Sequence, residues 1–149
     1  MSIEKFFSRR KGGRLIAIWI KDHRSEETEF FTPTGAEQQV GILKFNAGHE
    51  VKPHRHQPTT RYIENTSEVL LICRGRLAFT LYDDHGRHLC SDIASAGDIL
   101  CLYRGGHGFK MLDDCEIIEV KQGPYSREHD KTPIVPFGEG IPETSNGSV

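Results

Sequence analysis

The sequence predicts an all-β domain, a sandwich or barrel of short antiparallel strands. Apolar residues alternate with polar ones or form short runs rich in β-branched residues, and they do not recur every three to four residues over long stretches. Glycine and aspartate turns separate these runs at close spacing, as in Asp83–Gly86 and Ala96–Asp98. A chain of 149 residues suits one domain of this kind.

The composition argues against several other classes. Hydrophobic residues make up 36% and charged residues 27% of the chain, which is typical of a globular domain. With 19 basic and 21 acidic side chains the net charge is −2, so we expect neither a nucleic-acid nor a membrane partner. The longest apolar run, Leu15–Ile20, is too short to span a membrane. The four cysteines have no metal-site or redox spacing, and we expect reduced thiols in a cytoplasmic protein.

The elements follow in order along the chain. Residues 1–14 are predicted to form an N-terminal segment with a short helix over 3–10, residues 15–122 a β-barrel, and residues 123–149 an irregular tail. The predicted strands are 15–20, 29–32, 40–45, 51–56, 69–73, 77–82, 87–93, 99–103, 109–112 and 116–120. The apolar side chains expected to point inward from them are Leu70, Ile72, Phe79, Leu81, Ile99 and Ile118.

A His-x-His pair and two distant residues are the candidate metal ligands. Because alternate residues of a strand share one face, His54 and His56 project together, about 7 Å apart along the strand. Glu68 opens an apolar strand, where a carboxylate is costly unless it is paired or coordinated. His107 follows the Gly105–Gly106 turn. Each residue alone also fits a hydrogen-bonded or solvated position. Together, three imidazoles and a carboxylate suit one divalent transition metal, namely Fe, Mn, Ni, Cu or Zn.

The order and spacing of these residues resemble the two motifs of the cupin family. The first motif corresponds to Gly48, five residues, His54-Arg55-His56, and then Glu68, six residues and Gly75. The second corresponds to Gly97, five residues, Tyr103-Arg104-Gly105, one residue and His107. This sequence departs from the family pattern in the long insert of residues 57–67 and in Tyr103, which replaces a proline.

The resemblance covers about residues 40–121 and implies a single-domain cupin, a double-stranded β-helix or jelly-roll barrel. It also implies a metal held inside the barrel by His54, His56, Glu68 and His107, with residues 57–67 as a loop at the barrel mouth. In that loop Arg61 has the paired donors to bind a substrate carboxylate or phosphate, although a solvated loop arginine is the simpler interpretation. Tyr62 and Tyr103 are further candidates for substrate binding.

We therefore expect a metal-dependent enzyme acting on a small polar substrate, such as a sugar or a keto or carboxylic acid. Dioxygenase, isomerase and decarboxylase chemistry all stay open, and Glu68 has an alternative role as a catalytic base. The alternative function is a non-catalytic cupin module that binds a small molecule or carbohydrate as a sensor or accessory protein. The resemblance also predicts a homodimer.

Overall fold

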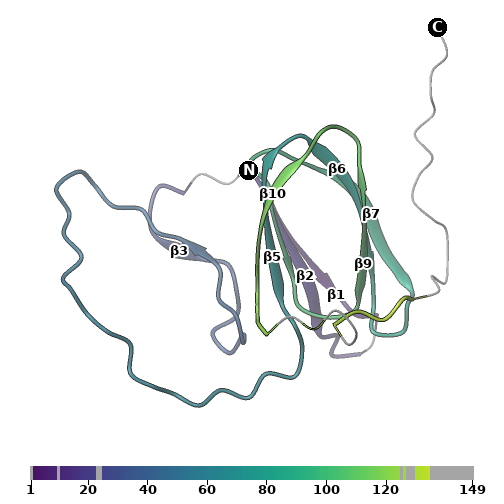
Figure 1. Cartoon of the computed structure of the whole chain (residues 1–149), viewed down its shortest axis with the longest axis horizontal. Coiled ribbons are helices and arrows are strands. Elements are labelled where there is room, and N and C mark those ends of the chain that lie inside the picture. Colours follow the sequence, from purple (N-terminus) through teal and green to yellow (C-terminus); the bar gives the residue numbers. More distant parts are fainter. Residues whose placement is uncertain (1, 10, 23–24, 125, 127–129, 135–149) are drawn as a thin grey trace, which may run out of the picture. The chain divides into compact units, whose positions relative to one another are not determined.

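The computed structural model describes residues 2–9, 11–22, 25–124, 126 and 130–134. The chain divides into unit 1, Met1–His23 with Thr66–Val149, and unit 2, Arg24–Asn65, and each unit is described by itself. Every regular element in the described residues is a β-strand, which confirms the all-β class (Figure 1). In these residues there is accordingly no helix with the length and apolar character to cross a membrane.

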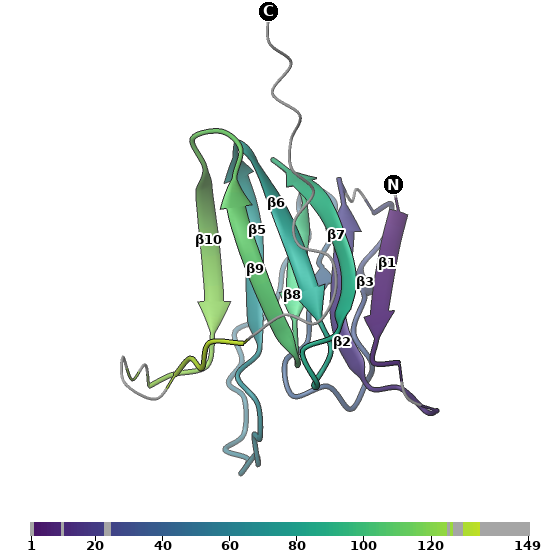
Figure 2. The same ribbon diagram turned by 90° about the vertical axis from the view of Figure 1, so that its right-hand side faces the viewer.

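Unit 1 is built from two antiparallel sheets that face each other (Figures 1 and 2). The five-stranded sheet has the order β1 (Ser2–Phe7), β2 (Leu15–Lys21), β8 (Ile99–Leu102), β5 (Glu68–Arg74) and β10 (Glu116–Lys121). The three-stranded sheet has the order β7 (His88–Ser95), β6 (Arg76–Tyr82) and β9 (Gly106–Met111). These strands confirm the predicted ones from residue 15 to 20 and from residue 69 onward, with bounds that differ by a few residues.

The two sheets do not close into the predicted barrel within the described residues. β9 and β10 are consecutive strands, yet they belong to different sheets and each is an edge strand of its own sheet. These two edge strands lie on the same side of the sandwich, opposite β1 and β7 (Figure 2).

The predicted N-terminal helix is wrong, because its described residues form a strand. β1 pairs antiparallel with β2, from Ser2 opposite Lys21 to Phe6 opposite Ala17. The apolar spacing of this segment fits one turn of an amphipathic helix, but pairing with the buried β2 outweighs such a weak local preference. Residue 10, the end of the predicted helix, lies outside the described residues.

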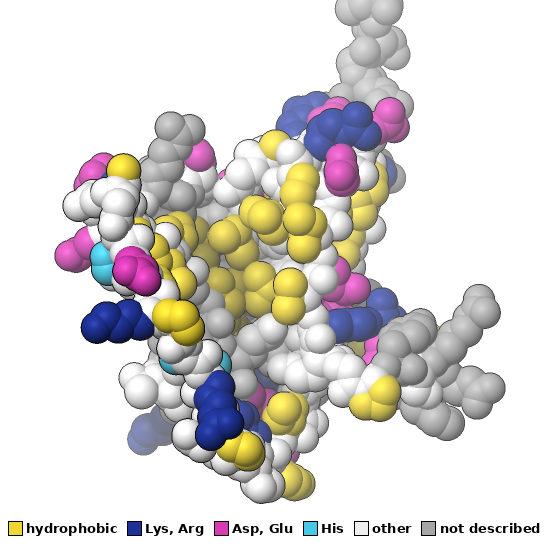
Figure 3. Space-filling view, turned by 60° about the vertical axis from the view of Figure 1, so that its left-hand side comes forward, with side chains coloured by type: hydrophobic (Ala, Val, Ile, Leu, Met, Phe, Trp, Pro, Cys, Tyr) yellow, Lys and Arg dark blue, Asp and Glu magenta, His cyan; other side chains and the backbone are white. Residues whose placement is uncertain are grey.

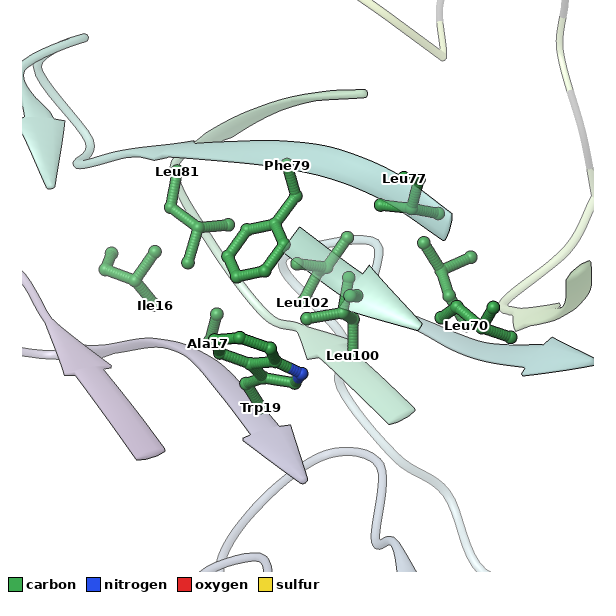
Figure 4. Close-up of a cluster of buried hydrophobic side chains, with 11 residues drawn as sticks. Ile16, Ala17, Trp19, Leu70, Leu77, Phe79, Leu81, Leu100 and Leu102 are labelled. Carbon is green, nitrogen blue, oxygen red and sulfur yellow. The ribbon is translucent and has the colours of Figure 1, made fainter. Parts of the chain in front are cut away.

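The hydrophobic core of unit 1 lies between the two sheets (Figure 4). The rings of Trp19 from β2 and Phe79 from β6 meet edge to face, with centroids 4.9 Å apart. The buried cluster consists of Ile16, Ala17, Trp19, Leu70, Ile72, Leu77, Phe79, Leu81, Ala94, Leu100 and Leu102. It contains four of the six predicted inward side chains. The prediction for Ile118 is wrong, since its side chain is 53% exposed, and Ile99 does not belong to this cluster.

A buried carboxylate ties β2 to the turn before β8. Asp98 accepts hydrogen bonds from the indole Nε1 of Trp19 at 3.2 Å and from the backbone N–H groups of Asp22 and Ser95, each at 3.0 Å. The Asp98 side chain thus satisfies three donors next to the core, where an unpaired donor is costly.

Unit 2 contains little regular structure in its described residues. β3 (Glu29–Phe30) and β4 (Gly41–Ile42) form a two-residue antiparallel pair, much shorter than the strands predicted at 29–32 and 40–45. Residues 51–56, also predicted as a strand, form no regular element.

Candidate functional site

The centre of the candidate site is a contact between two of the predicted ligands. Glu68 is the first residue of β5 and is buried, with 7% of its surface exposed. His107 is the second residue of β9, which belongs to the other sheet. The Nε2 atom of His107 lies 3.2 Å from Oε2 of Glu68. Two residues that are far apart in the sequence therefore meet across the sandwich, as the predicted metal site requires of this pair.

Two lysines complete the electrostatic surroundings of Glu68. The Nζ atom of Lys121 lies 3.9 Å from Oε1 of Glu68, because Lys121 is the cross-strand partner of Glu68 in the β5–β10 pair. The pKa of Glu68 is lowered below its ordinary value, chiefly by the hydrogen bond from His107. Burial of the carboxyl group raises the pKa, but by less. The positive charges of His107, Lys121 and Lys131 lower it further. Glu68 is therefore ionised at neutral pH.

A pocket of about 460 Å³ lies beside the Glu68–His107 pair. This size is in the range of small-molecule sites. Residues from β5, from the β8–β9 connection and from the segment 130–134 line it, namely Thr66, Glu68, Leu102, Arg104, Gly105, Gly106, His107, Asp130, Lys131, Thr132, Pro133 and Ile134.

The segment 130–134 is held in place at both of its ends. Lys121 binds Asp130 at 3.2 Å between Nζ and Oδ2, and hydrogen bonding to Asp130 raises the pKa of Lys121. At the other end Ile134 packs so closely on Gly106 that a Cβ atom there would overlap its Cδ1 atom. The neighbouring Gly105 has a φ of 70°, and a Cβ at this position would overlap the carbonyl oxygen of Tyr82. The two glycines therefore allow the β8–β9 turn to form one wall of the pocket.

The other two predicted ligands, His54 and His56, lie in unit 2. Their rings are neighbours, with centroids 5.4 Å apart, and both side chains are exposed. The Nδ1 atom of His54 lies 3.0 Å from the carbonyl oxygen of Lys52, which can only accept a hydrogen bond. In the described part of the chain, no three His, Cys, Asp or Glu side chains are grouped closely enough to hold a metal.

The predicted substrate-binding residues are not among those that line this pocket. Arg61 and Tyr62 belong to unit 2; both are exposed, and the Arg61 guanidinium lies 3.4 Å from the carbonyl oxygen of Thr59. Tyr103 belongs to unit 1 and is 8% exposed. Burial raises the pKa of its hydroxyl, as it raises the pKa of the nearby Cys101 thiol to about 12.

Sequence reasoning missed four charged residues of this site: Arg104, Lys121, Asp130 and Lys131. Arg104 was within reach of a sequence argument, because it stands three residues before His107 and next to the Gly105–Gly106 turn. Asp130 and Lys131 carry no such signal, since they lie in a segment without periodicity. Their place beside Glu68 depends on the ion pair with Lys121.

Comparisons of the chain with known protein families, with curated proteins and with solved structures give no match.

Proposed function

We propose that this protein is a cupin-type metalloprotein, in which His54, His56, Glu68 and His107 hold one divalent transition metal. The proposal depends chiefly on one observation, the approach of His107 to Glu68 to 3.2 Å at the edge of a pocket. These residues come from different sheets, and both are ligands in the site that the cupin resemblance implies. We propose further that the protein is an enzyme acting on a small polar molecule in the cytoplasm.

The donor atoms of unit 1 fit a metal of this kind. Nitrogen and oxygen ligands bind such ions at about 2.1 Å, so two of them on one ion lie roughly 3.0 Å apart in octahedral and roughly 3.4 Å apart in tetrahedral geometry. The observed separation of 3.2 Å between Nε2 and Oε2 falls between these values. In the neutral tautomer that donates from Nδ1, the Nε2 atom of His54 would add a nitrogen ligand of the same chemistry.

The electrostatics favour Glu68 as a ligand over Glu68 as a general base. A general base works best when its pKa lies near the working pH, which for a carboxyl group requires a raised pKa. The pKa of Glu68 is lowered instead, by the hydrogen bond from His107. An ionised carboxylate of this kind is what a divalent cation binds. The bound metal would polarise a carbonyl or hydroxyl group of the substrate.

The test is the metal content of the untagged protein, measured by elemental analysis after dialysis. The wild type is expected to bind roughly one equivalent of a transition metal, and His54→Ala/His56→Ala is expected to lose it. A matched control is His49→Ala/His85→Ala, which also removes two histidines and should keep the metal. Absence of metal from the wild type after reconstitution, or equal metal in both double variants, would contradict the proposal.

The alternative function, a non-catalytic binding module, is favoured by the pocket itself, because the described residues that line it all belong to unit 1. Turnover of candidate sugars and keto acids, with and without a chelator, distinguishes the two functions. Turnover that the chelator abolishes indicates the enzyme; binding without turnover indicates the module.

We also propose a homodimer that uses the outer face of β5 and β10. This face exposes Leu71, Ile118 and Val120 by 37%, 53% and 53%, and hydrophobic side chains gather on this side of unit 1 (Figure 3). The substitution Ile118→Lys is expected to weaken the dimer in sedimentation equilibrium. A wild type that is only monomeric at micromolar concentration would refute the dimer.

A further inference from the structure

The charges that surround the pocket do not balance. The carboxylate of Glu68 is compensated by His107 and Lys121, and that of Asp130 is compensated by Lys121. Arg104 also lines the pocket, and its guanidinium makes no hydrogen bond or ion pair with any residue that the structure describes.

Lys131 adds a second positive charge to the same wall. It acts on Glu68 through its charge alone, without a hydrogen bond. Two cations thus line a pocket in which both acids are already paired. A positive surplus in a concave site attracts a negative ligand.

We propose that this pocket binds a small organic carboxylate, with Arg104 as its principal anchor and Lys131 as a second positive charge. This inference deepens the proposed function, since it names the substrate class of the same site. Arginine suits the role because its planar fork can bind both oxygens of a carboxylate. The hydroxyl groups of Thr66 and Thr132 offer further polar contacts, and Leu102, Pro133 and Ile134 offer an apolar wall for the rest of the molecule.

The charge pattern favours a carboxylate over two other classes of ligand. An uncharged sugar would leave Arg104 without a counter-charge. A phosphate dianion would bring a second negative charge close to Glu68 and Asp130, which repel it. A keto or hydroxy acid has one carboxylate for Arg104 and a neighbouring oxygen that can face the Glu68–His107 pair.

The test is calorimetric titration of the full chain with pyruvate, lactate, inorganic phosphate and glucose at constant ionic strength. The protein is first freed of metal with phenanthroline and dialysed, because EDTA is itself a polycarboxylate. Wild type is expected to bind pyruvate or lactate with millimolar or better affinity. Arg104→Gln should weaken this binding at least about tenfold, since charge-assisted hydrogen bonds contribute roughly 1.5–3 kcal/mol.

Two further variants test whether the effect of Arg104→Gln comes from the lost guanidinium contact or from the change in net charge. Lys110→Gln makes the same change in net charge at an exposed site of β9 that does not line the pocket, and it should bind like wild type. Arg104→Lys keeps the charge without the planar fork and should bind with intermediate affinity. Circular dichroism checks that each variant is folded.

The outcomes distinguish this inference from the proposed metal site. Carboxylate binding that persists in His54→Ala/His56→Ala, in a protein that takes up no metal, supports the inference although the metal proposal fails. Wild-type protein that binds no carboxylate, that prefers phosphate, or that binds equally well after Arg104→Gln overturns the inference, whether or not a metal is bound.

Discussion

Replacing Glu68 by glutamine tests whether its charge stabilises the fold as the structure indicates. The variant keeps the shape of the side chain and removes the negative charge that lies 3.2 Å from His107 and 3.9 Å from Lys121. Removing one partner of a fully buried pair costs about 3–5 kcal/mol, and an exposed pair contributes less than about 1 kcal/mol. The side chain of His107 is 29% exposed and that of Lys121 is 17% exposed. For this intermediate case we expect Glu68→Gln to lower the free energy of unfolding by about 1–2 kcal/mol at pH 7.

The pH dependence of this loss identifies the charge as its cause. The pKa of Glu68 lies below its ordinary value of 4.5 because His107 donates a hydrogen bond to the ionised form. A group whose pKa is lowered by folding stabilises the protein above its unfolded pKa, and this contribution disappears as the pH falls through the folded pKa. The difference between wild type and variant should therefore be full at pH 7, begin to shrink as the pH falls below the ordinary value of 4.5, and disappear as the pH falls through the lowered pKa of the folded protein.

The assay is urea unfolding of the metal-free protein at a series of pH values. It is followed by the fluorescence of Trp19, the only tryptophan of the chain, which lies in the core. Glu116→Gln, at an exposed position of β10, is the matched control and should change the free energy of unfolding by less than about 0.5 kcal/mol. A deficit that stays the same size as the pH is lowered from 7 until the carboxyl group of folded Glu68 is protonated would show that the loss comes from packing and would refute the electrostatic account. No deficit at pH 7 would refute it as well.

Two further predictions concern the support of the core and of the pocket wall. Asp98→Ala should destabilise unit 1 by about 2–4 kcal/mol, because it leaves three donors without their acceptor, including the indole N–H of Trp19. Urea unfolding measures this loss, and Asp98→Asn, which keeps an acceptor oxygen, should lose less. Gly105→Ala should cost about 1–3 kcal/mol, because of its positive φ and the overlap of a Cβ with the Tyr82 carbonyl. Gly108→Ala, where a Cβ meets nothing within 4 Å, is its control, and equal midpoints for the two alanine variants would contradict the argument.

The sequence predicted the strands of unit 1 well where local signals define them. The hairpin between β6 and β7 is an example. Asp83, predicted as the start of this turn, accepts hydrogen bonds from the backbone N–H groups of His85 at 2.9 Å and Arg87 at 3.1 Å. The physical signal for such a turn lies within a few residues, so it can be read from the sequence alone.

Predictions of which face a side chain occupies failed where the register is irregular. Ile118 was expected in the core and is exposed. A bulge between Glu116 and Ile117 shifts the pairing of β10 with β5, and a shift of one residue moves every following side chain to the other face of the sheet. Ile118 is therefore opposite Leu71, on the outer face. The N-terminal strand was missed for a related reason, since β1 owes its conformation to pairing with β2.

The predicted four-residue metal site stays a prediction. The cupin resemblance selected Glu68 and His107 as two of its ligands, and the structure places their side chains 3.2 Å apart. The resemblance gave no role to Arg104, which lies within its second motif, and no signal pointed to Asp130 or to the contact that Lys121 makes with both acids.

The sequence by itself determined the all-β class of this protein and most of the strands of unit 1, because alternation and turn residues are local signals that involve only neighbouring positions. Only the tertiary structure decided which strands are edges, which apolar side chains stay exposed and which cations face the pocket. These features depend on the register and order of strands that are distant in the chain. The free energy of pairing two such strands is gained only when the sheets assemble, so it cannot be inferred from any one segment.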